Sequence, residues 1–428
     1  MAIANVKSPT TAVAAPASST KLALAVVTSL FFMWGFVTVL NDVLVPHLKS
    51  IFDLKYAKAS LIQSSFFLAY FIFSIPSAKL IDAVGYKKTM VIGVIVMGLG
   101  ALLFIPAAMV PSYPLFLAAL MVLAGGITAL QVAANPYVAV LGPPETASSR
   151  LNLSQAFNSL GTAIAPYLGG HLILSTTAKD MNAVRQISAD ALQAYRVHEA
   201  ASVKLPYLVI GLALVALGMV ISLFTLPPLP GAEHHKGDVA GSLWKCRHLV
   251  LGVVGIFVYV GAEVSIGSFL INYFSQSNIG NISELAAAKY VSFYWTGAMI
   301  GRFIGSAILQ KARTGAVLGI AALSASCLVF VSILSSGHLA MWSIILVGLF
   351  NSVMFPSIFT LGIAELGPLT GDGSGLLIMA IVGGAVIPFA QGSLADRIGL
   401  HHAFILPAIC YLYIVYYAFR GSKPVATA

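Results

Sequence analysis

The chain has 428 residues, of which 59% are hydrophobic and 9% are charged, and its mean hydropathy is +0.93. A soluble domain is nearer half apolar and a quarter charged, so this chain has too little polar surface to coat a water-soluble globule, and lipid must cover much of it. Its net charge of +9 comes from thinly spread basic residues rather than from basic patches interleaved with aromatic residues, which argues against a nucleic-acid partner.

Residues 1–20 are rich in Ala, Ser, Thr and Pro, and they are expected to form a disordered cytoplasmic tail. The apolar stretch from Leu22 to about Pro46 is too long for the core of a signal peptide and lacks a cleavage site, so it predicts a first membrane helix.

A helix that spans a bilayer needs about 20 mostly apolar residues. Twelve such stretches follow one another along the chain: 22–46, 59–82, 88–109, 113–141, 150–175, 204–227, 248–275, 286–310, 314–335, 339–364, 373–396 and 401–420. The predicted fold is an all-α membrane protein of about twelve transmembrane helices in two pseudo-symmetric six-helix bundles, 21–227 and 248–420. A polar cytoplasmic linker, 228–247, joins the bundles, and 421–428 form a second cytoplasmic tail.

The distribution of Lys and Arg predicts the orientation of the helices. With the N-terminus inside, the inner links and tails receive 14 of these residues and the outer links receive 9, by a count over the predicted spans. Both termini are therefore expected on the cytoplasmic side.

The two halves also repeat sequence patterns at matching places. The fifth span contains Gly161 and Pro166 and the eleventh contains Gly383 and Pro388, each within G-x4-P-x3-G. The fourth and tenth spans both end in Leu-Gly-Pro. Repeats of this kind build many secondary transporters, whose substrate site lies at the interface of the repeats near the membrane midplane.

Two acidic residues fall well inside predicted spans, Asp42 in the first and Glu263 in the seventh. Charged groups are costly in hydrocarbon and usually face a cavity, a partner or an ion pathway. Each carboxyl suits carriage of a proton or ligation of Na+, and each equally suits a hydrogen bond between helices.

Neutral polar residues also share helix faces in several spans. Amides and hydroxyls can hydrogen-bond the hydroxyls of a sugar, and an indole can stack on a sugar ring. The alternative is that the amides form hydrogen bonds between membrane helices. The candidate sugar-binding residues are Trp34, Thr38, Asn41, Gln131, Asn135, Gln155, Asn158, Tyr259, Asn272 and Asn351.

Motifs for other activities are absent. There is no G-x4-G-K-[ST] and no H-E-x-x-H, so neither ATP-driven transport nor a zinc-protease site is expected, and no cofactor or metal is predicted. A membrane enzyme acting on a lipid-linked sugar remains an alternative. Such an enzyme would usually carry an acidic or histidine cluster in an interfacial loop, and the predicted loops are poor in acidic residues. A third alternative is a non-transporting sugar receptor, which would normally carry a soluble signalling domain.

Residues 78–88, AKLIDAVGYKK, resemble the loop signature of the major facilitator superfamily, in which an aspartate and basic residues brace the cytoplasmic side. The resemblance makes Asp82, Lys87 and Lys88 gate residues, with Arg302 as their counterpart in the second half. Ala78 and Ala83 depart from the usual glycine and basic residue. The run SLADRIG at 393–399 resembles the same signature but falls on the predicted outer side.

More specific runs span nearly the whole chain: 40–46 (LNDVLVP), 61–71, 130–143, 150–161, 260–273 and 350–363. They resemble the fucose–galactose–glucose:proton symporter family, and its glucose/galactose branch in particular. The resemblance implies proton coupling at Asp42. Fucose members carry a glutamate where Gln131 stands and a glutamine where Glu263 stands, so the second carboxylate is expected to have moved to the C-terminal half.

The sequence therefore predicts a monomeric transporter in the plasma (inner) membrane that imports a hexose by symport with H+. Symport with Na+ and passive uniport remain alternatives.

Overall fold

The computed structural model of the protein describes residues 17–52, 56–110, 112–173, 201, 203–229 and 243–424. The side chains of residues 17–19, 40–51, 56–61 and 168–173 lie outside this description.

Six long helices make up the described N-terminal half, each matching one predicted span. They are α1 (Ala17–Phe52), α2 (Tyr56–Val84), α3 (Tyr86–Met109), α4 (Tyr113–Val140), α5 (Ala147–Ile173) and α8 (Lys204–Leu223).

The C-terminal half repeats this arrangement with three unbroken helices and three interrupted ones. The unbroken helices are α10 (Arg247–Phe274), α11 (Glu284–Ile308) and α12 (Thr314–Leu334). The interrupted spans are α13 (Gly337–Asn351) with α14 (Met354–Gly362); α15 (Thr370–Met379) with η3 (Ala380–Val382) and α16 (Gly383–Ile398); and α17 (Leu400–Ala403) with α18 (Ile405–Tyr416) and η4 (Tyr417–Gly421). Pro356 helps to explain the first interruption, because its missing N–H leaves the carbonyl of Ser352 without an intrahelical partner.

Ten segments of the described chain are long and apolar enough to cross a membrane. The two other long helices, α5 and α11, are more polar because they carry residues such as Asn152, Gln155 and Arg302. These two helices pack on each other between the halves, so their polar side chains meet there instead of facing lipid. The all-helical, two-half fold predicted from the sequence is confirmed.

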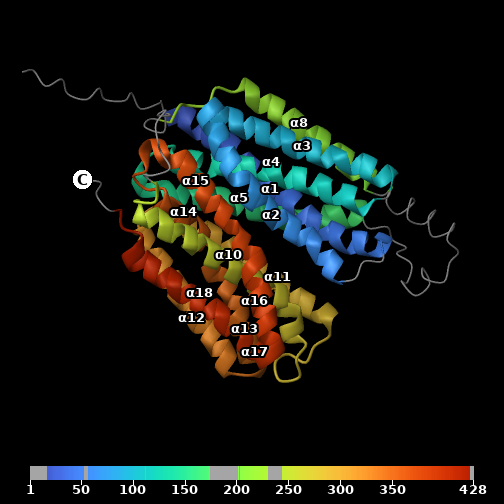
Figure 1. The fold of residues 1–428 in the computed structure, drawn as a ribbon. Coiled ribbons are helices and arrows are strands. Elements are labelled where there is room, and N and C mark those ends of the chain that lie inside the picture. Colours follow the sequence, from blue (N-terminus) through green and yellow to red (C-terminus); the bar gives the residue numbers. More distant parts are fainter. Residues whose placement is uncertain are drawn as a thin grey trace, which may run out of the picture.

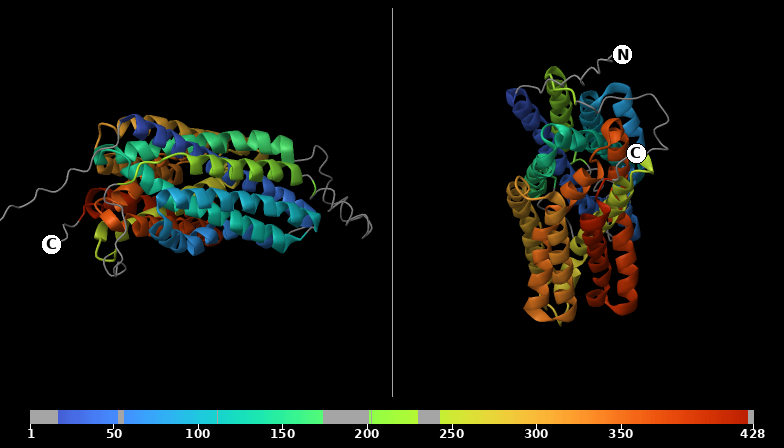
Figure 2. Two further views of the ribbon diagram at one scale, coloured as in Figure 1. Left: turned by 90° about the horizontal axis from the view of Figure 1, so that it is seen from above. Right: turned by 90° about the vertical axis from the view of Figure 1, so that its left-hand side faces the viewer.

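The halves lie against one another, with α1–α8 mostly in the upper part of Figure 1 and α10–α18 mostly in the lower part. Helix α15 is the exception, because it lies beside the N-terminal half at the upper left. Successive helices are antiparallel, so the connections between them lie at two opposite ends of the molecule. We call these the Gly85 end, at the left of Figure 1, and the Gly399 end. The described segments start (α1) and finish (η4) at the Gly85 end, which Figure 2 shows from two further sides.

Gly85 and Gly399 make the same tight turn between helices. Their φ values are +83° and +82°, a region that favours glycine. Each glycine N–H bonds the carbonyl four residues back, and each glycine carbonyl accepts from the N–H four residues ahead. One helix thus stops and the next begins within a single residue. The similarity between residues 78–88 and 393–399 therefore reflects shared turn geometry at opposite ends of the molecule.

The repeated glycines occupy equivalent contacts in the two halves. A Cβ at Gly161 on α5 would collide with the carbonyl oxygen of Phe32 on α1. A Cβ at Gly383, at the start of α16, would collide with the carbonyl oxygen of Phe257 on α10. In each half, the fifth span packs its backbone directly against the first. The Leu-Gly-Pro repeats also match, because each one leads into a short 3-10 turn, η1 (Pro144–Thr146) or η2 (Gly367–Leu369).

Candidate functional site

A cavity of about 400 Å³ lies between the halves, in the part of the molecule nearer the Gly399 end. Its N-terminal wall comes mainly from α2, and its C-terminal wall from α10 and α11. The lining residues are Thr38, Ile62, Gln63, Phe66, Phe67, Tyr70, Leu120, Val264, Gly267, Ser268, Trp295 and Ile381. The cavity combines aromatic faces with a few amide and hydroxyl groups, which suits a small ligand carrying both C–H and O–H groups.

The Gly85 end is closed by contacts between the halves. Ser149 Oγ donates to the carbonyl of Ser306 at 2.7 Å, and Asn152 Nδ2 donates to the carbonyl of Arg302 at 2.7 Å. Ser374 Oγ on α15 donates to the carbonyl of Val132 on α4 at 2.7 Å. The cavity therefore lies on one side of a sealed layer.

Of the predicted sugar-binding residues on α1, Thr38 lies at the cavity and Trp34 lies one helical turn before it. Thr38 lines the cavity, and its hydroxyl donates to the carbonyl of Trp34 at 2.7 Å. Trp34 is buried, with its ring centroid 4.0 Å from that of Phe31. Asn41 and Asp42 follow Thr38 within α1, but their side chains lie outside the described residues.

The amides of α4 lie behind the cavity wall. Gln131 Nε2 donates to the hydroxyl of Tyr70 at 2.7 Å, and Tyr70 lines the cavity, so Gln131 reaches the cavity through that phenol. Asn135 is fully buried, one helical turn along, and neither its Oδ1 nor its Nδ2 has a hydrogen-bond partner. A buried amide without partners is costly, which makes Asn135 a group that a polar ligand would satisfy.

The amides of α5 make contacts between helices. Asn158 Nδ2 donates to the carbonyl of Phe31 on α1 at 2.9 Å. The backbone carbonyl of Gln155 accepts from Arg302 of the other half at 3.4 Å. Neither residue lines the cavity, so their assignment to sugar binding stays a prediction.

In the C-terminal half, three of the predicted residues are brought together. Tyr259 donates its hydroxyl to the carbonyl of Asn351 at 3.0 Å, and Asn351 Nδ2 donates to the Tyr294 hydroxyl at 2.8 Å. Tyr294 in turn donates to the carbonyl of Glu263 at 3.5 Å, and one carboxyl oxygen of Glu263 is buried without a hydrogen-bond partner. Asn272 lies apart, exposed near the end of α10.

Several cavity residues were not singled out in the sequence. Trp295 and Ser268 stand in apolar runs, where they look like packing residues. Gln63 could have been identified from the sequence, because it is an amide inside the predicted second span, one helical turn before Phe66 and Phe67. Among the described residues, no group of three or more His, Cys, Asp or Glu could hold a metal ion.

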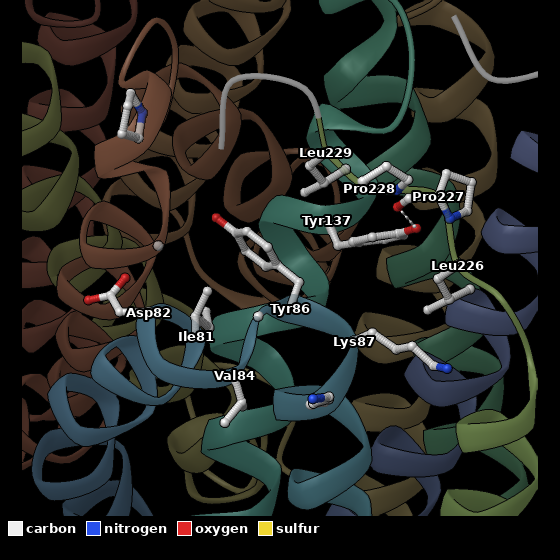
Figure 3. Close-up of a pocket in the computed structure, with 14 residues that line it drawn as sticks. Ile81, Asp82, Val84, Tyr86, Lys87, Tyr137, Leu226, Pro227, Pro228 and Leu229 are labelled. Carbon is white, nitrogen blue, oxygen red and sulfur yellow. Dashed lines mark hydrogen bonds between the residues drawn. The ribbon is translucent and has the colours of Figure 1, made fainter. Parts of the chain in front are cut away.

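The predicted gate residues surround a second cavity of about 340 Å³ at the Gly85 end. Figure 3 shows Asp82 and Lys87 pointing to opposite sides of the turn. Asp82 lies toward the start of α15, where a Cβ on Gly371 would come within 3.8 Å of its carboxyl oxygen. Lys87 donates to the carbonyl of Ser222 on α8 at 2.8 Å, and Lys88 also lines the cavity.

Tyr86 and Tyr137 also line this second cavity and lie near the centre of Figure 3, where the Tyr137 hydroxyl donates to the carbonyl of Pro227 at 2.9 Å. Arg302 lies elsewhere: it sits inside α11 and bonds α5. Arg302 does not line this cavity and lies inside α11, six residues before the end of that helix, so its assignment to the gate stays a prediction.

Comparisons with known proteins agree with this architecture. A sequence profile described as Major Facilitator Superfamily matches residues 22–387. A glucose/galactose transporter of Brucella abortus is 51% identical over 403 residues, which cover 94% of each chain. The L-fucose-proton symporter of Escherichia coli is 36% identical over 407 residues, which cover 93% of each chain.

Among solved structures, a crystal structure of the transporter FucP in the outward conformation superposes with a TM-score of 0.88 at 34% identity. The match covers 95% of this chain and all of that one. The superfamily profile, the level of identity and the shared fold lead to one conclusion: the chain is a transporter rather than an enzyme, a multi-pass membrane protein that belongs to the major facilitator superfamily and, within it, to the fucose–galactose–glucose:proton symporter family.

Proposed function

We propose that the protein imports a hexose of the glucose/galactose type by symport with a proton, through alternating access. The observation that carries the proposal is the 400 Å³ cavity between the halves, sealed at the Gly85 end by hydrogen bonds across the interface. Its volume lies in the range of small-molecule sites. The names of the relatives supply the substrate class.

Sugar recognition is assigned to both walls of the cavity. Trp295 and Phe66 offer aromatic faces for the C–H side of a pyranose, while Gln63, Thr38 and Ser268 offer groups that hydrogen-bond its hydroxyls. Tyr70 presents its ring to the cavity and is held by Gln131. Closing the cavity around the sugar would bring the unpartnered amide of Asn135 into use.

Proton coupling is assigned to Glu263 and Asp42. The Glu263 carboxyl has a buried oxygen without a partner, and a carboxyl is far less costly to bury when it is neutral than when it is charged. A bound proton is the simplest way to neutralise it, so H+ is preferred over Na+ as the coupling ion. No other cofactor is required.

The Gly85 end is assigned to the cytoplasm, because Lys87 and Lys88 lie there and basic residues concentrate on the inner side. This orientation places both termini in the cytoplasm. The two relatives compared are bacterial proteins, which supports an assignment to the inner membrane. A monomer is proposed because one chain supplies both walls of the cavity.

The test is uptake of labelled glucose, and in parallel galactose, into proteoliposomes that hold the purified protein, under an inward proton gradient in sodium-free buffer. Accumulation above equilibrium that collapses with a protonophore is expected. Equilibration without accumulation would overturn proton coupling, and uptake of neither sugar would overturn the substrate class.

Replacing Glu263→Gln should abolish accumulation and spare exchange of sugar, because the amide keeps the shape of the carboxyl but does not take up and release a proton near neutral pH. Counterflow and proton-driven uptake are compared in the same vesicles. Glu284→Gln is the matched control, since Glu284 is an exposed residue of the first turn of α11. Undiminished accumulation by the Glu263→Gln protein would remove Glu263 from the coupling mechanism.

A further inference from the structure

A chain of hydrogen bonds links four helices at the Gly399 end, and it starts at His401 on α17. His401 Nε2 lies 2.7 Å from the carbonyl oxygen of Ile333 on α12, and its Nδ1 lies 3.2 Å from the hydroxyl of Tyr273 on α10. That hydroxyl lies 2.9 Å from the Oγ of Ser332, which donates to the carbonyl of Ala340 on α13 at 2.9 Å. Tyr273 and Ser332 are fully buried, so bulk water does not replace a partner that is lost there.

The protons of this chain can be counted from its two ends. A carbonyl oxygen only accepts, so Ser332 uses its one hydroxyl proton on Ala340. Tyr273 then gives its one proton to Ser332, at Oγ or at the backbone carbonyl 3.3 Å away, and its own oxygen must accept from His401 Nδ1. At the other end, the Ile333 carbonyl requires a proton on His401 Nε2. Both ring nitrogens therefore carry a proton, which makes this ring an imidazolium.

A neutral ring cannot complete the chain. If its one proton is on Nε2, Nδ1 becomes an acceptor, and the Tyr273 hydroxyl would have to donate to it instead of to Ser332. Ser332 would then have to leave the Ala340 carbonyl, or two oxygens would face each other with no proton between them. If the one proton is on Nδ1, the Ile333 carbonyl loses its donor. A neutral ring thus costs one hydrogen bond among buried groups, and the imidazolium costs none.

The equivalent turn at the other end of the molecule holds a permanent cation at the same place. Lys87 is the second residue after the glycine of its turn, and it donates to the carbonyl of Ser222, one residue before the end of α8. His401 is the second residue after the glycine of its own turn, and it contacts the carbonyl of Ile333, one residue before the end of α12. Cations are favoured at the C-terminal end of a helix, where carbonyls lack intrahelical partners. The same position takes a cation at both ends, but the charge of a histidine changes between about pH 5 and 8.

Other titratable groups lie on the elements around His401. They are His402 of α17, Tyr273 of α10, Asp396 and Arg397 of α16, and His338 of α13. The rings of His401 and His402 have their centroids 5.1 Å apart, and His402 is exposed. Asp396 and Arg397 are also exposed and carry opposite charges, so their fields largely cancel and are screened by water. The hydrogen-bond chain is therefore the feature that favours a charged ring at His401.

We propose that His401 is a proton-binding site at the Gly399 end, separate from the coupling carboxyls. The bound proton completes the chain that fastens α17 to α10, α12 and α13, and its release at higher pH breaks that chain. Helix α10 also supplies Val264, Gly267 and Ser268 to the cavity, so the proton fastens a helix of the cavity wall. His401 itself does not line the cavity, and its proton stays in place while sugar moves. The site responds to the pH outside the cell, a step that rests on the orientation proposed above.

The first test compares melting temperatures of the purified full-length protein at pH 5.5 and pH 8.5. At pH 5.5, His401→Gln should melt about 2–4 °C below the wild type, because the chain loses a hydrogen bond from a charged group. At pH 8.5 the gap should shrink to about 1 °C or less, because the wild type has then released the proton. His402→Gln is the matched control, since His402 is the exposed neighbour in the same turn, and it should follow the wild type at both pH values.

Two further measurements separate proton binding from a merely structural role. His401→Lys supplies a cation that does not titrate in this range, so it should melt above His401→Gln by the same margin at both pH values. Nitrogen NMR of protein with labelled histidines observes the proton itself. The chain has nine histidines, and the signal that is missing from His401→Gln identifies the ring. At pH 6 that ring should carry protons on both nitrogens.

An equal gap between wild type and His401→Gln at pH 5.5 and 8.5, or a single proton on the His401 ring at pH 6, would overturn the inference. If His401→Gln does not yield a folded protein by size-exclusion chromatography, Tyr273→Phe decides, because it breaks the chain at its centre and should show the same pH-dependent gap. These measurements need neither vesicles nor sugar. A wild type that fails to take up glucose or galactose therefore contradicts the proposed function and leaves the proton site standing.

Discussion

Two of the helix pairs that join the halves at the Gly85 end, which we call seams, are built with different chemistry. The seam between α5 and α11 is hydrogen-bonded, through Ser149 to the Ser306 carbonyl and Asn152 to the Arg302 carbonyl, each at 2.7 Å. The seam between α2 and α15 is tightly packed. A Cβ at Gly375 would lie 2.8 Å from the Cβ of Ala78, closer than such atoms approach in proteins.

These seams are equivalent by the internal repeat. Helices α5 and α15–α16 are each the fifth span of their half, while α2 and α11 are each the second. The repeat therefore fixes which helices meet, but not what holds them. Close packing loses its dispersion energy within a fraction of an ångström of separation, whereas hydrogen bonds can exchange partners as the helices move. We therefore expect substitutions in the packed seam to impair transport most. Substitutions in the bonded seam should mainly shift the equilibrium between the closed and the open state of the Gly85 end.

The largest effect is expected from Gly375→Val. The added side chain would press on Ala78 and on the carbonyl of Ser74, 3.2 Å from the new Cβ, and force the halves apart at the Gly85 end. Overpacking of this kind costs about 1–3 kcal/mol. Sugar counterflow should fall at least tenfold, and the melting temperature of the purified protein should drop.

The matched control is Gly392→Val, on α16, where the nearest atom to a new Cβ is a Phe269 ring carbon at 3.5 Å. Counterflow by the control should stay within about twofold of wild type, since the new Cβ would make only an ordinary van der Waals contact. Equal losses in the two variants would mean that the packed seam has no special intolerance.

Much of the packed architecture was predictable from the sequence. Hydropathy predicts the spans. The repeated glycines Gly161 and Gly383 mark close contacts between helices, because a residue without a side chain can be recognised directly in the sequence. The turn at Gly85 was equally predictable, since the aspartate, the glycine and the basic residues lie within one short stretch of the sequence, 82–88.

The site was less predictable, because an amide in a membrane helix carries no sign of its partner. Asn158 and Gln131 look alike in the sequence, yet Asn158 bonds the backbone of α1 while Gln131 holds a cavity tyrosine. Trp295 faces the cavity and is indistinguishable in the sequence from an aromatic residue that faces lipid. Arg302 was predicted only as the counterpart of the gate residues, and nothing in the sequence indicated that it would lie against Ser159 on α5.

A moderate effect is expected from Asn152→Ala in the bonded seam. The substitution removes one hydrogen bond between the halves together with a buried amide oxygen that has no partner, so the net loss is about 1 kcal/mol or less. The melting temperature should fall slightly, and counterflow should change by no more than about threefold. Gln310→Ala, exposed at the end of α11, is the control. A tenfold loss of counterflow would show that the bonded seam is as intolerant as the packed one.

The smallest effect is expected from Lys87→Met, which removes a contact that lies within one half. Lys87 on α3 donates to the Ser222 carbonyl on α8. Both helices belong to the N-terminal half, so this hydrogen bond is kept when the two halves move relative to each other. It is also exposed, where a single hydrogen bond changes stability by about 0.5 kcal/mol or less. Melting temperature and counterflow should both match the wild type. A loss of counterflow at unchanged melting temperature would mean that Lys87 contacts the other half during the transport cycle. Lys87 would then belong to the contacts between the halves and not to those within one half.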